Sequence, residues 1–211
     1  DLVIEKIAMP ESFTDHFAES TDNAMVIGIR KHFEDAAENF ATAAASLAPV
    51  IEDASGRIVN AFMANHRVFT CGNGGSAGDA QHFAAELIGR FEAERQELAA
   101  IALTTDTSII TAVANDYSFS QIFSRQVRGL GHAGDVLLAI STSGNSANVI
   151  EAIKSAHEHD MHIVALTGKG GGQIGEMLRD DDIHLCVPAD RTARIQETHL
   201  LVIHCLCDGI D

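Results

Sequence analysis

Basic residues are scarce in this sequence. Its 211 residues include 14 Lys and Arg against 30 Asp and Glu, a formal net charge of -16. A protein that binds nucleic acid needs a basic face to meet the phosphates, so this balance argues against that class. An anionic membrane surface is an unfavourable partner for the same reason. The acidity does not exclude a small anionic ligand, because backbone N–H groups bind phosphate without Lys or Arg.

Long apolar runs are also missing, and cysteine is rare. No stretch of about 18 apolar residues occurs, so the sequence predicts no membrane-spanning helix. A secretory signal has a basic segment followed by an apolar segment, and the chain does not open with that pattern. The 4 cysteines each sit in an apolar run, and a chain with 46% hydrophobic residues can bury a core without disulfides. We therefore expect reduced thiols and a cytosolic protein.

The first part of the chain differs from the rest. Residues 1–26 are polar and weakly patterned, and we interpret them as an N-terminal extension that need not belong to the natural protein. From residue 27 to residue 211 we expect a single domain. Its first segment has apolar residues at helical spacing with a break near Pro49, which predicts a hairpin of two helices over residues 28–48 and 50–64.

Five short apolar runs follow, each with the length of a strand that is buried on both faces. They cover residues 67–71, 100–104, 135–140, 162–167 and 183–187. Helical patterns separate them over residues 76–89, 106–114, 119–130, 146–158 and 172–179, and a last helix is expected over residues 191–210. Strands that alternate with helices predict an α/β fold, a parallel five-stranded sheet with helices on both sides. Ligands bind such sheets beyond the carboxyl ends of the strands.

Glycines and hydroxyl groups follow three of these strands. The loop Gly72–Gly78 matches the loose dinucleotide fingerprint, but that fingerprint needs an acidic residue about 20 residues later, and the nearest candidate, Asp106, lies much further on. A dehydrogenase is therefore disfavoured. The loop Ser141–Ser146 carries hydroxyl and amide groups just before a helix, which suits a phosphate. A polar turn with an N-cap serine explains that loop equally well. A third loop, residues 168–172, is rich in glycine.

A histidine and a glutamate share one helix face after the first loop. His82 and Glu86 stand four residues apart, so the pair could ligate a metal or carry acid–base chemistry. A solvated pair without a chemical role is the alternative. On the last helix, Gln196 and His204 are separated by about 80° of rotation and loosely share a side, whereas His199 points elsewhere.

Longer segments identify a family. The stretch Cys71–Phe91, CGNGGSAGDAQHFAAELIGRF, resembles the sugar isomerase (SIS) fold and specifically the phosphoheptose isomerase family. Similar segments at 102–108, 114–117, 134–148, 192–197 and 203–207 extend the resemblance over residues 28–211. It implies a flavodoxin-like three-layer αβα sandwich and a cytoplasmic homotetramer with active sites between subunits. It also implies conversion of sedoheptulose 7-phosphate to D-glycero-D-manno-heptose 7-phosphate, which opens ADP-heptose synthesis for the lipopolysaccharide core.

The resemblance further implies a zinc site and a set of substrate contacts. One zinc ion per subunit would be held by His82, Glu86, Gln196 and His204. Substrate contacts would come from Glu86 and Gln196 and from Asn73, Gly74, Gly75, Asn115, Asp116, Ser141, Thr142, Ser143 and Ser146, with Arg90 and Thr192 as further candidates. Isomerisation moves a proton between neighbouring carbons through an enediol, and we hypothesise that Glu86 is the base and His204 the acid. A group bound to zinc is a poorer proton carrier, so the ligand and catalyst roles compete.

Two other functions stay open. A regulatory tetramer of the same fold that binds the replication initiator DnaA is similar over the same stretch, but it lacks acidic and histidine groups at the positions of Glu86 and His204. A glucosamine- or arabinose-phosphate isomerase of this fold is the second alternative. We favour an enzyme over the regulator, because a binding protein has no need for that constellation. We favour heptose over the other sugars, because the local motifs resemble the heptose family more closely.

Overall fold

The computed structural model describes the backbone of residues 11–211 and the side chains of residues 24–211. Contacts divide the chain into two units, residues 1–38 and 39–211. The described part of the first unit is helical, and Met25, Ile27 and Phe33 are exposed there. The predicted extension over residues 1–26 lies partly outside the described residues. Its described part is helix that continues into the residues that follow, so the change in composition does not coincide with the end of an element.

A single helix, α1 (Glu11–Met63), stands where two helices were expected. Pro49 lies inside it, so the prediction of a hairpin with a break at this residue is wrong. Proline removes one backbone hydrogen bond and costs roughly 3 kcal/mol in a helix interior. Leu47 on one side of Pro49 and Ala54 and Ile58 on the other are buried in the same core cluster. Burial of each large apolar side chain contributes roughly 1.5–3 kcal/mol, so continuous packing outweighs the lost bond.

The predicted parallel sheet is confirmed. Its strands are β1 (Val68–Cys71), β2 (Ala100–Ala102), β3 (Val136–Ser141), β4 (His162–Thr167) and β5 (Ile183–Cys186). They pair in the order β2-β1-β3-β4-β5, and every pair is parallel. The strand order reverses between β1 and β3, because β2 lies on one side of β1 and all later strands lie on the other. In an open parallel sheet such a switch point is where a ligand crevice forms.

The connecting helices agree with the predicted ranges, with one exception. They are α2 (Gly75–Ile88), α3 (Thr107–Asp116), α4 (Ser124–Leu130), α5 (Ala147–Glu158), α6 (Gly172–Met177) and α7 (Thr192–Ile210), with short 3-10 helices η1 (Phe119–Gln121) and η2 (Lys169–Gly171). The segment expected as one helix over residues 119–130 is η1 followed by α4. Ile122 and Phe123 are both buried at this junction. Both residues keep right-handed helical backbone angles, so the chain passes here from a 3-10 helix to an α-helix without leaving the helical region.

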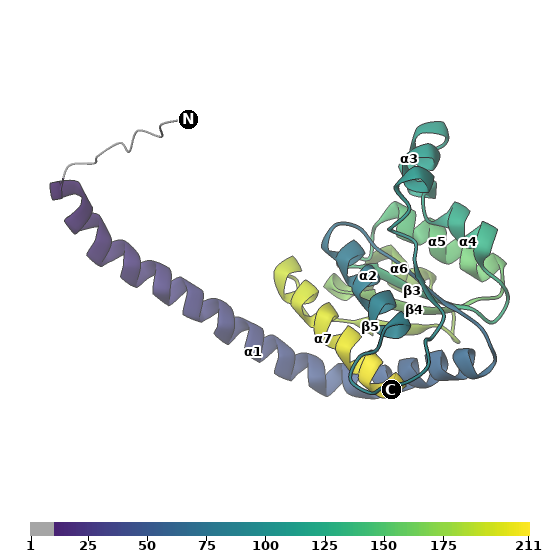
Figure 1. Ribbon diagram of the computed structural model, residues 1–211. Coiled ribbons are helices and arrows are strands. Elements are labelled where there is room, and N and C mark those ends of the chain that lie inside the picture. The colour runs from purple at the N-terminus through teal and green to yellow at the C-terminus, as the bar shows by residue number, and fades with distance from the viewer. Residues whose placement is uncertain (1–10) are drawn as a thin grey trace. The chain divides into compact units, whose positions relative to one another are not determined.

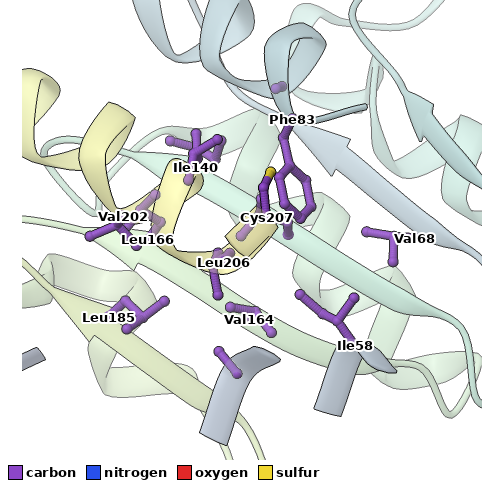
Figure 2. Packing of buried hydrophobic residues seen from close by; sticks show 14 of the residues in the cluster. Ile58, Val68, Phe83, Ile140, Val164, Leu166, Leu185, Val202, Leu206 and Cys207 are labelled. Carbon is purple, nitrogen blue, oxygen red and sulfur yellow. The ribbon is translucent and has the colours of Figure 1, made fainter. Parts of the chain in front are cut away.

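Helices cover both faces of the sheet, which makes the fold a three-layer αβα sandwich (Figure 1). Alternate residues of the central strand β3 belong to two separate cores, one on each face. Val136, Leu138 and Ile140 pack with α2, α7 and the part of α1 after residue 39. Figure 2 shows this cluster, with the Phe83 ring of α2 beside Cys207 of α7. Leu137 and Ala139 pack on the other face, with α3, α4, α5 and α6. The helices that cover the first face include both helices on which chemistry was predicted.

Two further observations concern the helices and the thiols. No helix among the described residues combines the length and the apolar character needed to cross a bilayer. The four thiols are free, and Cys71 and Cys207 are buried. Burial raises the pKa of each of these two thiols to about 12, so neither is a nucleophile at neutral pH.

Candidate active site

Two loops flank the switch point of the sheet. The first loop (residues 72–74) joins β1 to α2, and the hydroxyl loop (residues 141–146) joins β3 to α5; β1 and β3 are neighbours in the sheet. Gly74 has φ +57, a backbone conformation that favours glycine. A side chain at Gly75 would overlap the amide group of Gln196 on α7. The glycines therefore bring α7 against the start of α2.

Two asparagine side chains join these loops across the switch point. The Asn73 amide donates to Asn148 Oδ1, and the Asn148 amide donates to Asn73 Oδ1, both at 2.8 Å. Asn148 is buried in the first turn of α5. The pairing occupies one donor and one acceptor of each amide. The side chain of Asn73 thus anchors the first loop; the predicted contact of Asn73 with substrate stays a prediction, and Asn148 was not predicted.

The hydroxyl loop presents its side chains beside the start of α5. Ser141 is buried and its hydroxyl lies 2.9 Å from that of Ser146. Ser146 is the N-cap of α5 but its side chain makes no capping bond, because its hydroxyl faces Ser141 instead. Thr142, Ser143 and Ser146 are half-buried, and the loop contains no Lys or Arg. Hydroxyl groups beside the first-turn N–H groups of a twelve-residue helix suit a phosphate dianion.

The third glycine-rich loop braces the hydroxyl loop. The Gln173 backbone N–H donates to Asn145 Oδ1 at 3.1 Å, and Ile174 N–H donates to the Gly144 carbonyl at 2.9 Å. A side chain at Gly144, whose φ is +65, would overlap the carbonyl oxygen of Gly171. The two loops therefore meet backbone to backbone, which fixes the path of the hydroxyl loop.

Three of the predicted chemical groups lie together between α2 and α7. The Nε2 atoms of His82 and His204 are 2.9 Å apart, and Nδ1 of His82 is 3.5 Å from Glu86 Oε1. The rings of His82 and His204 meet edge to face. The Phe91 ring stacks on the His204 ring, with 5.6 Å between the ring centroids. The side chains of His82 and Glu86 are 35% and 23% exposed, so a small ligand can reach them. A carboxylate and two imidazoles at this spacing can accept and donate protons.

Asp79 lies one helical turn before His82 on α2. It is buried, and its Oδ2 atom has no hydrogen-bond partner among the described residues. Desolvation raises the pKa of its carboxyl group to about 6, and the nearby His82 partly opposes that rise. Asp79 is therefore a second carboxyl group beside the histidine pair.

The fourth predicted zinc ligand, Gln196, lies further along the helices. It sits against Gly75, whereas His204 sits against His82, so α2 and α7 run parallel and side by side. The seven residues from Gly75 to His82 correspond to roughly 10 Å of helix. His199 points away from this surface, as predicted: it is buried, and its Nε2–H donates to the Thr167 carbonyl at 3.0 Å.

The donor types at this surface suit zinc, but only two of the four proposed ligands point toward a common centre. Two imidazoles, a carboxylate and an amide oxygen are groups that bind zinc in proteins. The facing Nε2 atoms of His82 and His204 converge on one point, while Glu86 faces Nδ1 of His82. Within residues 24–211, no group of three or more His, Cys, Asp and Glu side chains is arranged to hold a metal ion. Glu86 and Gln196 would have to turn to complete such a site.

The remaining predicted contacts are exposed. Asn115 and Asp116 lie at the last turn of α3, where the Asn115 amide donates to Asp116 Oδ1 at 2.8 Å. Among the described residues, no hydrogen bond or ion pair links them to the first loop or the hydroxyl loop. Thr192 is the first residue of α7, and Arg90 pairs with Glu94 at 3.7 Å. Arg90 adjoins Phe91, which stacks on His204, and Thr192 is one helical turn before Gln196, whereas Asn115 and Asp116 stand apart from the two loops.

Comparison with known proteins decides the family. Residues 31–168 match the model of the SIS domain. The phosphoheptose isomerase of Dechloromonas aromatica (strain RCB) is 73% identical over 187 residues, which cover 89% of this chain and 95% of that protein. The chain belongs to the phosphoheptose isomerase family of SIS-domain proteins. It is thus a phosphosugar isomerase.

Further members and their solved structures agree with this assignment. The phosphoheptose isomerase of Azoarcus sp. (strain BH72) is 65% identical, covering 87% of this chain and 93% of that protein. The solved phosphoheptose isomerase of Neisseria gonorrhoeae has a TM-score of 0.85 and 53% identity, with 89% of this chain and 98% of that chain covered. That of Francisella tularensis has a TM-score of 0.87 and 46% identity over the same shares. The predicted SIS fold is therefore confirmed.

Proposed function

We propose that this isomerase converts sedoheptulose 7-phosphate to D-glycero-D-manno-heptose 7-phosphate. The observation that carries the proposal is the group of Glu86, His82 and His204. Glu86 and His82 lie on α2, which begins at the first loop, and His204 of α7 lies against His82. Relatives named phosphoheptose isomerase support the choice of a seven-carbon sugar. The proposed product feeds ADP-heptose and lipopolysaccharide core synthesis in the cytoplasm.

The proposed reaction is a proton transfer between two carbons. The Glu86 carboxylate removes a proton from C1 of the open-chain ketose, while His204 donates a proton to the oxygen on C2, which gives the enediol. Glu86 then returns the proton to C2, and the hydroxyl proton on O1 passes back to His204 as the C1 aldehyde forms. Atoms and charge balance, because each group ends as it began. Glu86 faces Nδ1 of His82, away from the Nε2 atoms, and this position supports its role as a base.

We propose that zinc is held by His82, Glu86, Gln196 and His204. When bound, zinc polarises the carbonyl and hydroxyl oxygens of the substrate as a Lewis acid. The types of donor support this assignment, and the converging histidine nitrogens supply two of the four ligands. The chain's own residues would orient the sugar. Asn73 and Gly74 of the first loop and Gly75 at the start of α2 would lie at the sugar end, and Ser141, Thr142, Ser143 and Ser146 of the hydroxyl loop at the phosphate.

We propose a homotetramer in which Asn115 and Asp116 reach the site of a neighbouring subunit. Their exposed position at the end of α3, apart from the loops, supports an intersubunit site. An apolar groove between α1 and α7 is lined by Phe40, Leu47, Leu201 and Cys205. It supports assembly, since Leu201 in its lining and the neighbouring Leu200 remain exposed.

A coupled assay tests the function. The wild type, supplied with zinc, should convert sedoheptulose 7-phosphate and lose turnover when a chelator removes the metal. Glu86→Gln should lower kcat by about 10²- to 10⁴-fold with zinc still bound. Glu94→Gln, at an exposed glutamate in the segment that follows α2, is the matched control. Full turnover in Glu86→Gln would refute the base assignment. No turnover of wild type with zinc would favour the DnaA-binding regulator, and preference for arabinose 5-phosphate or glucosamine 6-phosphate would favour the other isomerases.

A further inference from the structure

The end of α2 is capped by a side chain from the segment that follows it. The last carbonyl groups of a helix lack partners within the helix. Here the Arg95 guanidinium donates from Nη2 to the Glu86 carbonyl and from Nη1 to the Leu87 carbonyl, each at 2.9 Å. A cation at this end also complements the helix dipole. Arg95 therefore holds the turn of α2 that carries the Glu86 side chain.

The same guanidinium is fixed by a carboxylate beyond α7. Arg95 Nε donates to Asp211 Oδ1 at 2.7 Å, and Asp211 Oδ2 accepts the backbone N–H groups of Glu92 and Ala93 at 3.0 and 2.9 Å. The Arg95 and Asp211 side chains are only 14% and 7% exposed. Desolvation raises the pKa of Asp211, but the hydrogen bonds from Ala93, Arg95 and Glu92 outweigh it and leave the pKa below its ordinary value. The carboxylate is thus ionised and fully engaged.

Between these contacts, the segment places an aromatic ring on His204. We call residues 89–98 the strap. Its Phe91 ring stacks on the His204 ring with the planes 30° apart, while His82 meets His204 edge to face. A ring held on two sides has little rotamer freedom. The strap therefore touches both ends of the proposed acid–base group: the Glu86 backbone through Arg95, and the His204 ring through Phe91.

We propose that Arg95 and Asp211 are positioning residues, which hold the strap so that Glu86 and His204 keep the spacing that isomerisation requires. The inference rests on the proposed function. Neither residue faces the loops at the switch point, so both act through Glu86 and Phe91 rather than through the substrate. A misplacement of about 1 Å lowers turnover by roughly 10²-fold, which gives the strap a measurable effect.

Two substitutions in the full-length chain test the proposal. Arg95→Met keeps the length of the side chain and removes all donors; Asp211→Asn keeps the shape and removes the charge. Both should lower kcat about 10- to 100-fold at a temperature where the protein stays folded, with KM within about twofold. Glu94→Gln, in the same strap with a side chain 90% exposed, should leave both constants unchanged. A change confined to KM, or no change in kcat, would overturn the proposal.

A spectroscopic measurement separates this inference from the proposed function. Histidine labelled with ¹³C reports the His204 ring protons, which lie under the Phe91 ring current in the wild type. Their shifts should move toward exposed values in Arg95→Met and in Phe91→Leu but not in Glu94→Gln. An unmoved signal in Arg95→Met overturns the strap's role. If the wild type fails to isomerise the heptose phosphate, the proposed function fails, while this signal still decides whether the strap holds His204.

Discussion

Asn73 and Asn148 hold the two loops of the site together through a reciprocal pair of amide hydrogen bonds. Each amide both donates and accepts at 2.8 Å, and Asn148 is buried. The pair crosses the point where the strand order of the sheet reverses. The sugar end and the phosphate end of the proposed site are therefore coupled by two side chains that no solvent separates.

Asn148→Asp should weaken this coupling. A carboxylate in place of the Asn148 amide cannot donate to Asn73 Oδ1, and it places two acceptors face to face. Loss of a buried hydrogen bond costs about 1–3 kcal/mol, so kcat/KM should fall about 10- to 100-fold. Steady-state kinetics check this, with Asn60→Asp on the exposed side of α1 as the matched control. Unchanged kinetics in Asn148→Asp would show that the first loop keeps its place without the pair.

Gly75→Ala should damage the site, whereas Gly78→Ala should not. An added methyl group at Gly75 would overlap the Gln196 amide, while nothing lies within 4 Å of one at Gly78. We expect turnover to fall at least about 10-fold in Gly75→Ala, because a displaced site residue costs on that scale. Gly78→Ala lies within α2 and should raise the free energy of unfolding by roughly 0.5–1 kcal/mol. Turnover and chemical unfolding of both variants, measured side by side, check this prediction. Equal turnover in Gly75→Ala and Gly78→Ala would contradict it.

The buried His199 should make stability fall as the pH drops from about 6.5 to about 4. Burial lowers the pKa of its imidazole to about 4, against 6.5 for the ordinary value. The unfolded chain therefore binds more protons in this window, and stability increases with pH. The contribution lost at the acid end is roughly 3 kcal/mol. His199→Gln keeps a donor for the Thr167 carbonyl and does not titrate, so its stability should depend less on pH.

Asp79 opposes His199 in part of the same window. Its raised pKa of about 6 means that the folded state binds more protons than the unfolded state between about 4 and 6. Stability from this group increases as the pH falls, so the slope of the wild type underestimates His199. The difference between wild type and His199→Gln, measured by urea unfolding at several pH values, isolates the histidine. If the free energy of unfolding of the two proteins depended equally on pH, His199 would not be a buried, neutral imidazole in the folded state.

Pro49→Ala should stabilise the chain. The substitution restores a backbone N–H that can bond within α1, which proline prevents, and it removes the clash of the ring with the preceding turn. The gain is at most about 3 kcal/mol. Thermal unfolding of Pro49→Ala and of Pro49→Gly should rank alanine above glycine. Loss of stability in Pro49→Ala would mean that contacts of the proline ring outweigh the missing bond.

The sequence predicted the sheet well, because its signals are local. A strand such as residues 136–141 is an unbroken apolar run, and each run ends in glycine or hydroxyl residues where the chain must turn. The pairing of His82 with Glu86 followed from helical spacing alone. The approach of His204 to His82 did not: the separation between them along the chain is bridged by packing of α7 against α2, and only the family resemblance grouped them.

Contacts between distant segments could not be predicted. Nothing in the local pattern pairs Asn73 with Asn148, or Arg95 with Asp211, since each residue alone looks like an ordinary polar position. At Pro49 the sequence predicted a break that the structure does not have. Proline does destabilise a helix, as the local rule states. The free-energy cost of Pro49 is smaller than the free energy gained by burying Leu47 and Ile58, and the sequence around the proline does not show that burial.

The parallel direction of α2 and α7 has an electrostatic consequence. Both helices begin at the edge of the sheet where the strands end, and α5 begins there too, so their N-terminal dipoles all turn positive ends toward the crevice. A chain with a formal charge of -16 thus carries a local field of the opposite sign. That field comes from backbone peptide groups, which do not titrate. An anion bound there would keep its electrostatic support across the whole pH range in which the helices stay folded.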